Sequence, residues 1–157
     1  MNNELKMSYT RRITQSNPSE IIAILYEIFF TYLQDGEEAM KCRNLEQARE
    51  ELRHASQVIQ HLKDALDRKQ ELSKQLYPLY DFCQRALEKS NYRGDLSGIE
   101  EARRIMGPLQ EAFQQIAKQD QSGSVMKHTQ TVLAGMTYGR GTLNETTIYE
   151  NNRGFLA

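Results

Sequence analysis

The chain has 157 residues, enough for one domain with additional tails but hardly for two hydrophobic cores. Its 20 Lys and Arg residues nearly balance 21 Asp and Glu residues, so the net charge is −1 and there is no basic excess for binding a nucleic-acid backbone or an anionic membrane. The two cysteines, Cys42 and Cys83, have no CxxC neighbour and are expected to be reduced thiols.

Residues 1–16 are predicted to form a flexible arm. They are mostly polar and carry no evident period, with Tyr9 and Ile13 as isolated apolar anchors that have no helix of their own. The arm has no apolar core of a secretory signal, and no stretch of the chain approaches the ~20 apolar residues of a membrane span. We therefore expect a cytoplasmic protein without membrane insertion.

The first predicted helix runs from about Pro18 to about Lys41. Asn17 can cap it, Pro18 suits its first position, and Glu20 stands where a capping box requires a carboxylate. At about 100° per residue, apolar side chains cover about two-thirds of its circumference. They are Ile21, Ile22, Leu25, Tyr26, Ile28, Phe29, Phe30, Tyr32 and Leu33.

This wide apolar face allows two interpretations. The helix is either the central helix of the core, or part of its face lines a groove that an apolar segment fills. The next predicted helix, which Asn44 can cap, carries only a narrow apolar stripe as far as Leu66, so it cannot cover the whole face.

Two further helices complete the predicted domain. One spans about residues 74–90 after a possible cap at Ser73, with a bend at Pro78. The other follows the capping-box pattern at residues 97–100 and ends near Lys118, and Gly107-Pro108 predicts a kink or local break within it. Four helices with short connections predict an all-α, antiparallel four-helix bundle over residues 17–118.

Residues 119–157 are predicted to form an irregular tail. They are rich in small and polar residues, with apolar groups spaced along them. These groups include Leu133, Met136, Leu143, Tyr149, Phe155 and Leu156. Either the arm or the tail could lie across the groove until a partner displaces it, which would lower the apparent affinity for the partner.

Candidate chemistry is sparse. The pair Glu51 and His54 has the Glu-x-x-His spacing of di-iron sites, but only one copy is present, so we interpret it as a solvated helix face. His61, followed by Lys63, loosely matches a phosphotransfer histidine, which leaves a histidine phosphotransfer domain as an alternative function. We predict no catalytic residue, metal site or cofactor, and no enzyme activity.

Several segments resemble, in order and spacing, the FliS family of flagellin export chaperones. The resemblance covers about residues 16–118. Its motifs are Ser16-Asn17-Pro18-Ser19-Glu20-Ile21-Ile22 followed by Leu25-Tyr26-Glu27, then Leu62-x-x-Ala65-Leu66-Asp67, and finally Leu76-x-x-Leu79-Tyr80-Asp81-Phe82. One departure is Glu27-Ile28, where the family has Asp-Gly.

The resemblance implies a helical bundle that binds the disordered C-terminal region of flagellin, prevents its premature polymerisation and helps to deliver it to the flagellar export gate. Such binding needs no nucleotide, because burial of apolar surface offsets the chain entropy that the segment loses. A structural helical protein that dimerises through residues 18–41 is a second alternative. The candidate partner-binding residues are Tyr9, Ile13, Ile21, Ile24, Leu25, Tyr26, Ile28, Phe29, Tyr32, Leu79, Tyr80 and Phe82.

Overall fold

The computed structural model describes residues 1–126, which form five α-helices and no strand. The helices are α1 (Asn3–Gln15), α2 (Pro18–Lys41), α3 (Leu45–Asp64), α4 (Glu71–Arg93) and α5 (Ser97–Gln119). The predicted all-α class is confirmed, and α2 has the bounds that its sequence signals predict.

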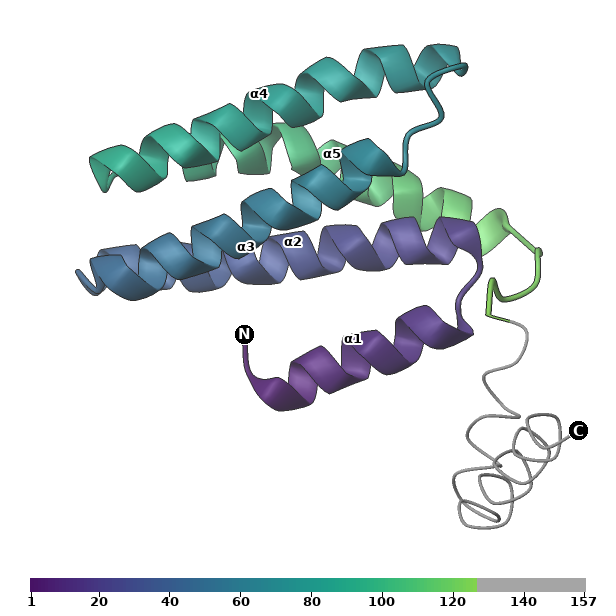
Figure 1. The fold of residues 1–157 in the computed structure, drawn as a ribbon, viewed down its shortest axis with the longest axis horizontal. Helices are drawn as coiled ribbons and strands as arrows, with labels where there is room; N and C mark the ends of the chain where they lie inside the picture. The colour runs from purple at the N-terminus through teal and green to yellow at the C-terminus, as the bar shows by residue number, and fades with distance from the viewer. Residues whose placement is uncertain (127–157) are drawn as a thin grey trace, which may run out of the picture.

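Helices α2 to α5 pack as a closed ring of neighbours. Helix α2 contacts α3 and α5, and α4 contacts the same two helices from the other side. Consecutive helices run in opposite directions, and α1 lies outside the ring along α2 (Figure 1). The ring encloses the core, whose largest fully buried side chains come from all four helices: Tyr26, Phe29, Leu33, Leu52, Ile59, Leu62, Tyr80, Leu87, Ile99 and Met106.

Helix α2 begins with the predicted capping box. The side chain of Asn17 accepts a hydrogen bond from the backbone N–H of Glu20 at 2.8 Å, and the Glu20 carboxylate accepts one from the backbone N–H of Asn17 at 2.9 Å. The cap of α3 is also confirmed, because the side chain of Asn44 accepts a hydrogen bond from the N–H of Gln47 at 3.2 Å. These bonds satisfy donors that helix ends otherwise leave unpaired.

The other two predicted caps are wrong. Ser73 is a buried residue inside the first turn of α4 and does not cap it. Ser97 is the first residue of α5, and its N–H donates instead to the carboxylate of Asp95 at 3.1 Å. Helix α4 continues to Arg93 and ends at Gly94, whose left-handed φ of 69° favours glycine.

Both internal prolines are accommodated without a break. Helix α4 is continuous through Pro78, and α5 is continuous through Gly107-Pro108, so of the kink or local break expected there the break does not occur. The proline ring at position 108 is on an exposed side of α5, while Met106 and Ile99 anchor the helix in the core. Packing therefore outweighs the one backbone bond that the proline removes.

The prediction that residues 1–16 have no helix of their own is wrong. The side chain of Asn2 accepts a hydrogen bond from the N–H of Leu5 at 2.8 Å and so caps α1, and Tyr9 is buried against the rest of the molecule. Leu5, Tyr9 and Ile13 stand four residues apart and share one face of the helix. The predicted tail begins where α5 ends, and its apolar residues from Leu133 onward lie outside residues 1–126.

Candidate partner-binding face

The predicted partner-binding residues fall into three groups by exposure. Tyr9, Ile24, Tyr26, Phe29 and Tyr80 are buried. Ile13, Ile21, Leu25, Ile28 and Tyr32 are half-buried. Leu79 and Phe82 are exposed.

Tyr26, Phe29 and Tyr80 belong to the core of the ring of helices. The hydroxyl groups of Tyr26 and Tyr80 are 2.6 Å apart, and the ring of Tyr26 stacks on that of Phe113 with centroids 5.4 Å apart. Burial raises the pKa of both Tyr26 and Tyr80, so their hydroxyl groups stay neutral. Tyr26 and Phe29 are fully enclosed by the helices, at 0% exposure.

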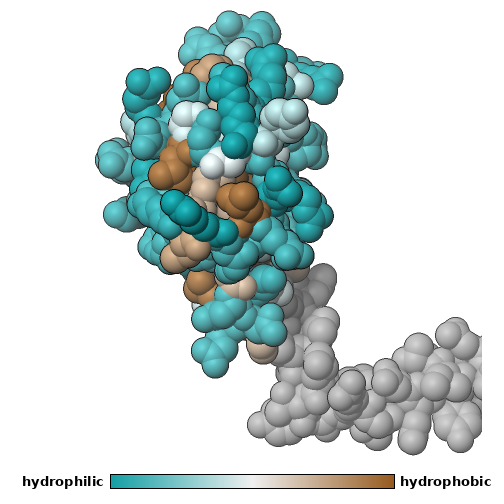
Figure 2. Space-filling model, turned by 90° about the vertical axis from the view of Figure 1, so that its left-hand side faces the viewer, coloured by the Kyte–Doolittle hydropathy of each residue, from teal (hydrophilic) through white to brown (hydrophobic). Residues whose placement is uncertain are grey.

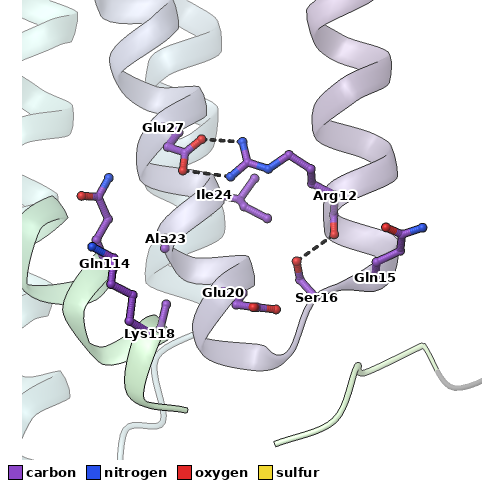
Figure 3. A pocket seen from close by; sticks show the side chains of 10 residues that line it. Arg12, Gln15, Ser16, Glu20, Ala23, Ile24, Glu27, Gln114 and Lys118 are labelled. Carbon is purple, nitrogen blue, oxygen red and sulfur yellow. Dashed lines mark hydrogen bonds and ion pairs between the residues drawn. The ribbon is translucent and has the colours of Figure 1, made fainter. Parts of the chain in front are cut away.

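Helix α1 covers one face of α2, and polar contacts hold it there. The hydroxyl of Tyr9 lies 3.1 Å from that of Thr31. The guanidinium of Arg12 donates two hydrogen bonds to the carboxylate of Glu27, at 2.6 and 3.0 Å (Figure 3). Tyr9 is the only buried side chain of α1. The contact between α1 and α2 therefore includes several polar interactions and buries little apolar area.

A cleft of about 580 Å³ lies between α1, α2 and α5. Its walls include Arg12 and Ser16 from the α1 side, Glu27 and Ile24 from α2, and Lys118 from α5 (Figure 3). Most of these side chains are polar, and the apolar part of the lining comes from Ala23, Ile24 and Ala117.

A separate part of the surface of α2 carries an apolar stripe. Ile21, Leu25, Ile28 and Tyr32 recur at spacings of four and three and are all half-buried. The ring of Tyr32 packs against His54 of α3 with centroids 4.9 Å apart. This stripe is one part of the wide apolar face that the ring of helices leaves partly uncovered, and Ile22 and Phe30 are also half-buried.

A second apolar surface surrounds the connection between α3 and α4. A pocket of about 220 Å³ there is lined mainly by apolar side chains, namely Ile22, Leu62, Leu66, Leu72, Leu76, Tyr80 and Phe113 together with shorter and polar neighbours. Leu72, at 54% exposure, lies in the first turn of α4, before residue 74, where the sequence pattern predicts that this helix starts. Leu79 and Phe82 lie farther along α4 and are also exposed.

The end of the molecule opposite the α3–α4 connection is more hydrophilic (Figure 2). It carries the α2–α3 and α4–α5 connections, and its surface is largely hydrophilic with separate apolar groups (Figure 2). Half-buried or exposed apolar side chains also lie along α2 and α4 and at the α3–α4 end.

The interpretation of Glu51 and His54 as a water-facing pair is wrong. Glu51 is buried and His54 is half-buried, because the beginning of the chain and Tyr32 of α2 cover them. Residues 1–126 contain no group of three or more side chains that could hold a metal ion. Both cysteines are free thiols, and burial raises the pKa of Cys83 to about 11.

Comparison with known proteins supports a single family. The family described as "Flagellar protein FliS" matches residues 1–120. A curated relative, the flagellar secretion chaperone FliS of Bacillus subtilis (strain 168), is 25% identical over 115 residues, which cover 71% of this chain and 86% of the relative. None of the helices in the matched region has the length and hydropathy needed to cross a membrane.

Proposed function

The chain belongs to the FliS family of flagellar proteins, and from this we propose that it is an export chaperone for flagellin. In this proposal it binds the disordered C-terminal segment of flagellin in the cytoplasm, prevents premature polymerisation and assists delivery to the export gate. FliS is a family of chaperones and not of enzymes, so the histidine phosphotransfer alternative is not retained.

The observation that carries the proposal is the family match, which covers α1 and the whole ring of helices. The relative's name identifies that protein as a flagellar secretion chaperone. We also infer that the ring α2 to α5 is the antiparallel four-helix bundle that the sequence predicts, with α2 as its widest apolar helix.

The stripe of Ile21, Leu25, Ile28 and Tyr32 is the surface that we assign to the partner. Its side chains are half-buried and lie beside α1, which contributes one buried side chain and several polar contacts. A disordered amphipathic segment that replaced α1 would bury more apolar area at about 25 cal/mol per Å². In this account α1 protects the stripe until flagellin arrives.

The exposed side chains of α4 are a second contact in the proposal. Leu72, Leu79 and Phe82 are large apolar side chains that are 54%, 38% and 42% exposed, so they offer apolar area to a partner. A segment that wraps around the bundle would cover both α2 and α4, as segments that fold on binding commonly do.

The experiment that tests the function compares two forms of flagellin from the same genome. The chaperone is immobilised and offered either full-length flagellin or flagellin that lacks its last ~40 residues, a length suited to a large coupled folding interface. We expect capture of the full-length protein only. Equal capture of both forms, or of neither, would contradict the proposal.

A further inference from the structure

A cluster of polar groups lies beneath the start of α1, between α2 and α3. The α-amino group of Met1 is 2.7 Å from Oδ2 of Asp35 and 3.2 Å from Oε1 of Glu51. Burial lowers the pKa of this amino group, but the bonds and charges of Asp35 and Glu51 more than offset that effect and raise the pKa above its usual value. The two carboxylates therefore hold an ammonium group.

The site around this ammonium is buried and not fully paired. Glu51 is only 9% exposed, and its second oxygen, Oε2, has no hydrogen-bond partner within residues 1–126. The Nδ1 atom of His54, one turn farther along α3, also lacks a partner there. A buried carboxylate without a cation is costly, so this cluster favours a bound positive charge.

The cleft that surrounds this cluster is also lined by acidic side chains. It has a volume of about 630 Å³, and its lining includes the carboxylates of Asp35, Glu38 and Glu51 but no lysine, arginine or histidine side chain. It also lies close to the apolar stripe, because the ring of Tyr32 packs against His54, one turn from Glu51 on α3, with centroids 4.9 Å apart. A segment lying on the stripe would therefore pass close to this cleft.

We infer that Asp35 and Glu51 form a cation subsite of the partner-binding face, which the α-amino group of Met1 fills while α1 is docked and a lysine or arginine side chain of the partner fills once α1 has left. The inference rests on the proposed function, since it requires that a partner displaces α1. Removing α1 takes the ammonium away from two carboxylates, one of them buried. A partner that supplies a positive charge at this point avoids the cost of the unpaired charges, whereas an apolar partner does not.

A double-mutant cycle on dissociation rates tests the inference. The protein variants are Glu51→Gln and Asp35→Asn, which keep side-chain shape and remove one charge each. Glu38→Gln is the matched control, because Glu38 lines the same cleft but is exposed and does not contact Met1. The probe is a synthetic peptide of the last ~40 residues of flagellin from the same genome, in which each lysine and arginine is replaced in turn by glutamine. Circular dichroism establishes that every protein variant is folded.

We expect one basic peptide position whose replacement speeds dissociation from the wild-type protein roughly tenfold, the scale of a close charge pair. The same replacement should have little further effect on the Glu51→Gln or Asp35→Asn protein, and its full effect on the Glu38→Gln protein. Dissociation is the informative rate, because weaker docking of α1 acts mainly on association.

If the effect of every basic peptide position on the dissociation rate adds to that of both protein variants, the inferred cation subsite is wrong and the proposed function still stands. If the wild-type protein does not bind the peptide at all, the proposed function fails and the subsite fails with it. A peptide position that couples equally to Glu38 would also overturn the inference, since the effect would then be general electrostatic attraction.

Discussion

The hydroxyl groups of Tyr26 on α2 and Tyr80 on α4 share a hydrogen bond of 2.6 Å across the centre of the core. Both side chains are almost completely buried, at 0% and 1% exposure. Helices α2 and α4 are opposite members of the ring, so this bond links the two helices that α3 and α5 otherwise separate. Each hydroxyl is the partner that allows the other to be buried.

Replacing both tyrosines should lower the free energy of unfolding by less than the sum of the two single replacements. Tyr26→Phe leaves the hydroxyl of Tyr80 buried without its partner, and we expect the free energy of unfolding to fall by about 1–3 kcal/mol. The double variant Tyr26→Phe/Tyr80→Phe should lose less than the sum of the single losses. Urea unfolding measures all three, with Tyr92→Phe as a control because Tyr92 is 89% exposed. Additive losses would show that the two hydroxyls are not coupled.

The contact between α4 and α5 depends on a glycine. A Cβ atom at Gly98 would lie 1.9 Å from the backbone oxygen of Ala86, which a side-chain rotation cannot relieve. We expect Gly98→Ala to lower the free energy of unfolding by at least about 1–3 kcal/mol, the usual cost of overpacking. Gly107→Ala is the matched control in the same helix, because nothing lies within 4 Å of its added Cβ atom. Its effect on stability should stay within about 1 kcal/mol, because helix propensity favours alanine while Pro108 disfavours a helical residue with a Cβ atom before it.

Thermal or urea unfolding of the two glycine variants decides the point. A Gly98→Ala protein as stable as the Gly107→Ala protein would mean that α4 and α5 do not approach each other as closely as this structure shows.

The ion pair between Arg12 and Glu27 should slow partner binding. Arg12→Gln removes two hydrogen bonds that hold α1 on α2, so α1 should leave the stripe more often and peptide association should be faster by several-fold. The matched control is Arg11→Gln, since Arg11 is an exposed neighbour of the same charge. Stopped-flow mixing with the flagellin peptide measures the rates. Identical association rates for wild type and Arg12→Gln would show that this ion pair does not control access.

The two thiols should differ in reactivity. Burial raises the pKa of Cys83 to about 11, so almost none of it is thiolate near pH 8, and its side chain is also inaccessible. Cys42 is exposed at the end of α2. Iodoacetamide at about pH 8 should therefore alkylate Cys42 and leave Cys83 intact until the protein is unfolded. Mass spectrometry of the folded protein checks this, and rapid labelling of Cys83 would indicate that the core opens readily.

Sequence patterns predict the ring of helices well, because long amphipathic periods and strong caps are local signals. The bounds of α2 follow from the capping box at Asn17 and from the apolar run that ends near Lys41. The start of α4 was misplaced, since Gln70 caps it without a side-chain bond and leaves no sequence signature. Helix α1 is hard to predict because only three apolar residues, Leu5, Tyr9 and Ile13, mark its helical period. Without Leu5, the other two residues do not define a period.

The candidate site is harder to predict than the fold. The helical wheel shows that the face of α2 is too wide for the core, but it does not show that Tyr26 and Phe29 point inward while Leu25 and Ile28 stay half-buried. That division depends on where α1, α3 and α5 pack. The burial of Glu51 likewise depends on Met1, which is 50 residues away in the sequence.

The most direct test of the central claim is a calorimetric titration of the protein with the peptide of the last ~40 residues of flagellin. We expect one-to-one binding with a micromolar or lower dissociation constant and a negative heat-capacity change, because a disordered segment folds onto apolar surface. A polar substitution in the half-buried stripe, Ile28→Asn, should weaken this binding by about 1 kcal/mol or more while the protein stays folded. Absence of binding by the folded wild-type protein at peptide concentrations well above micromolar would contradict the account.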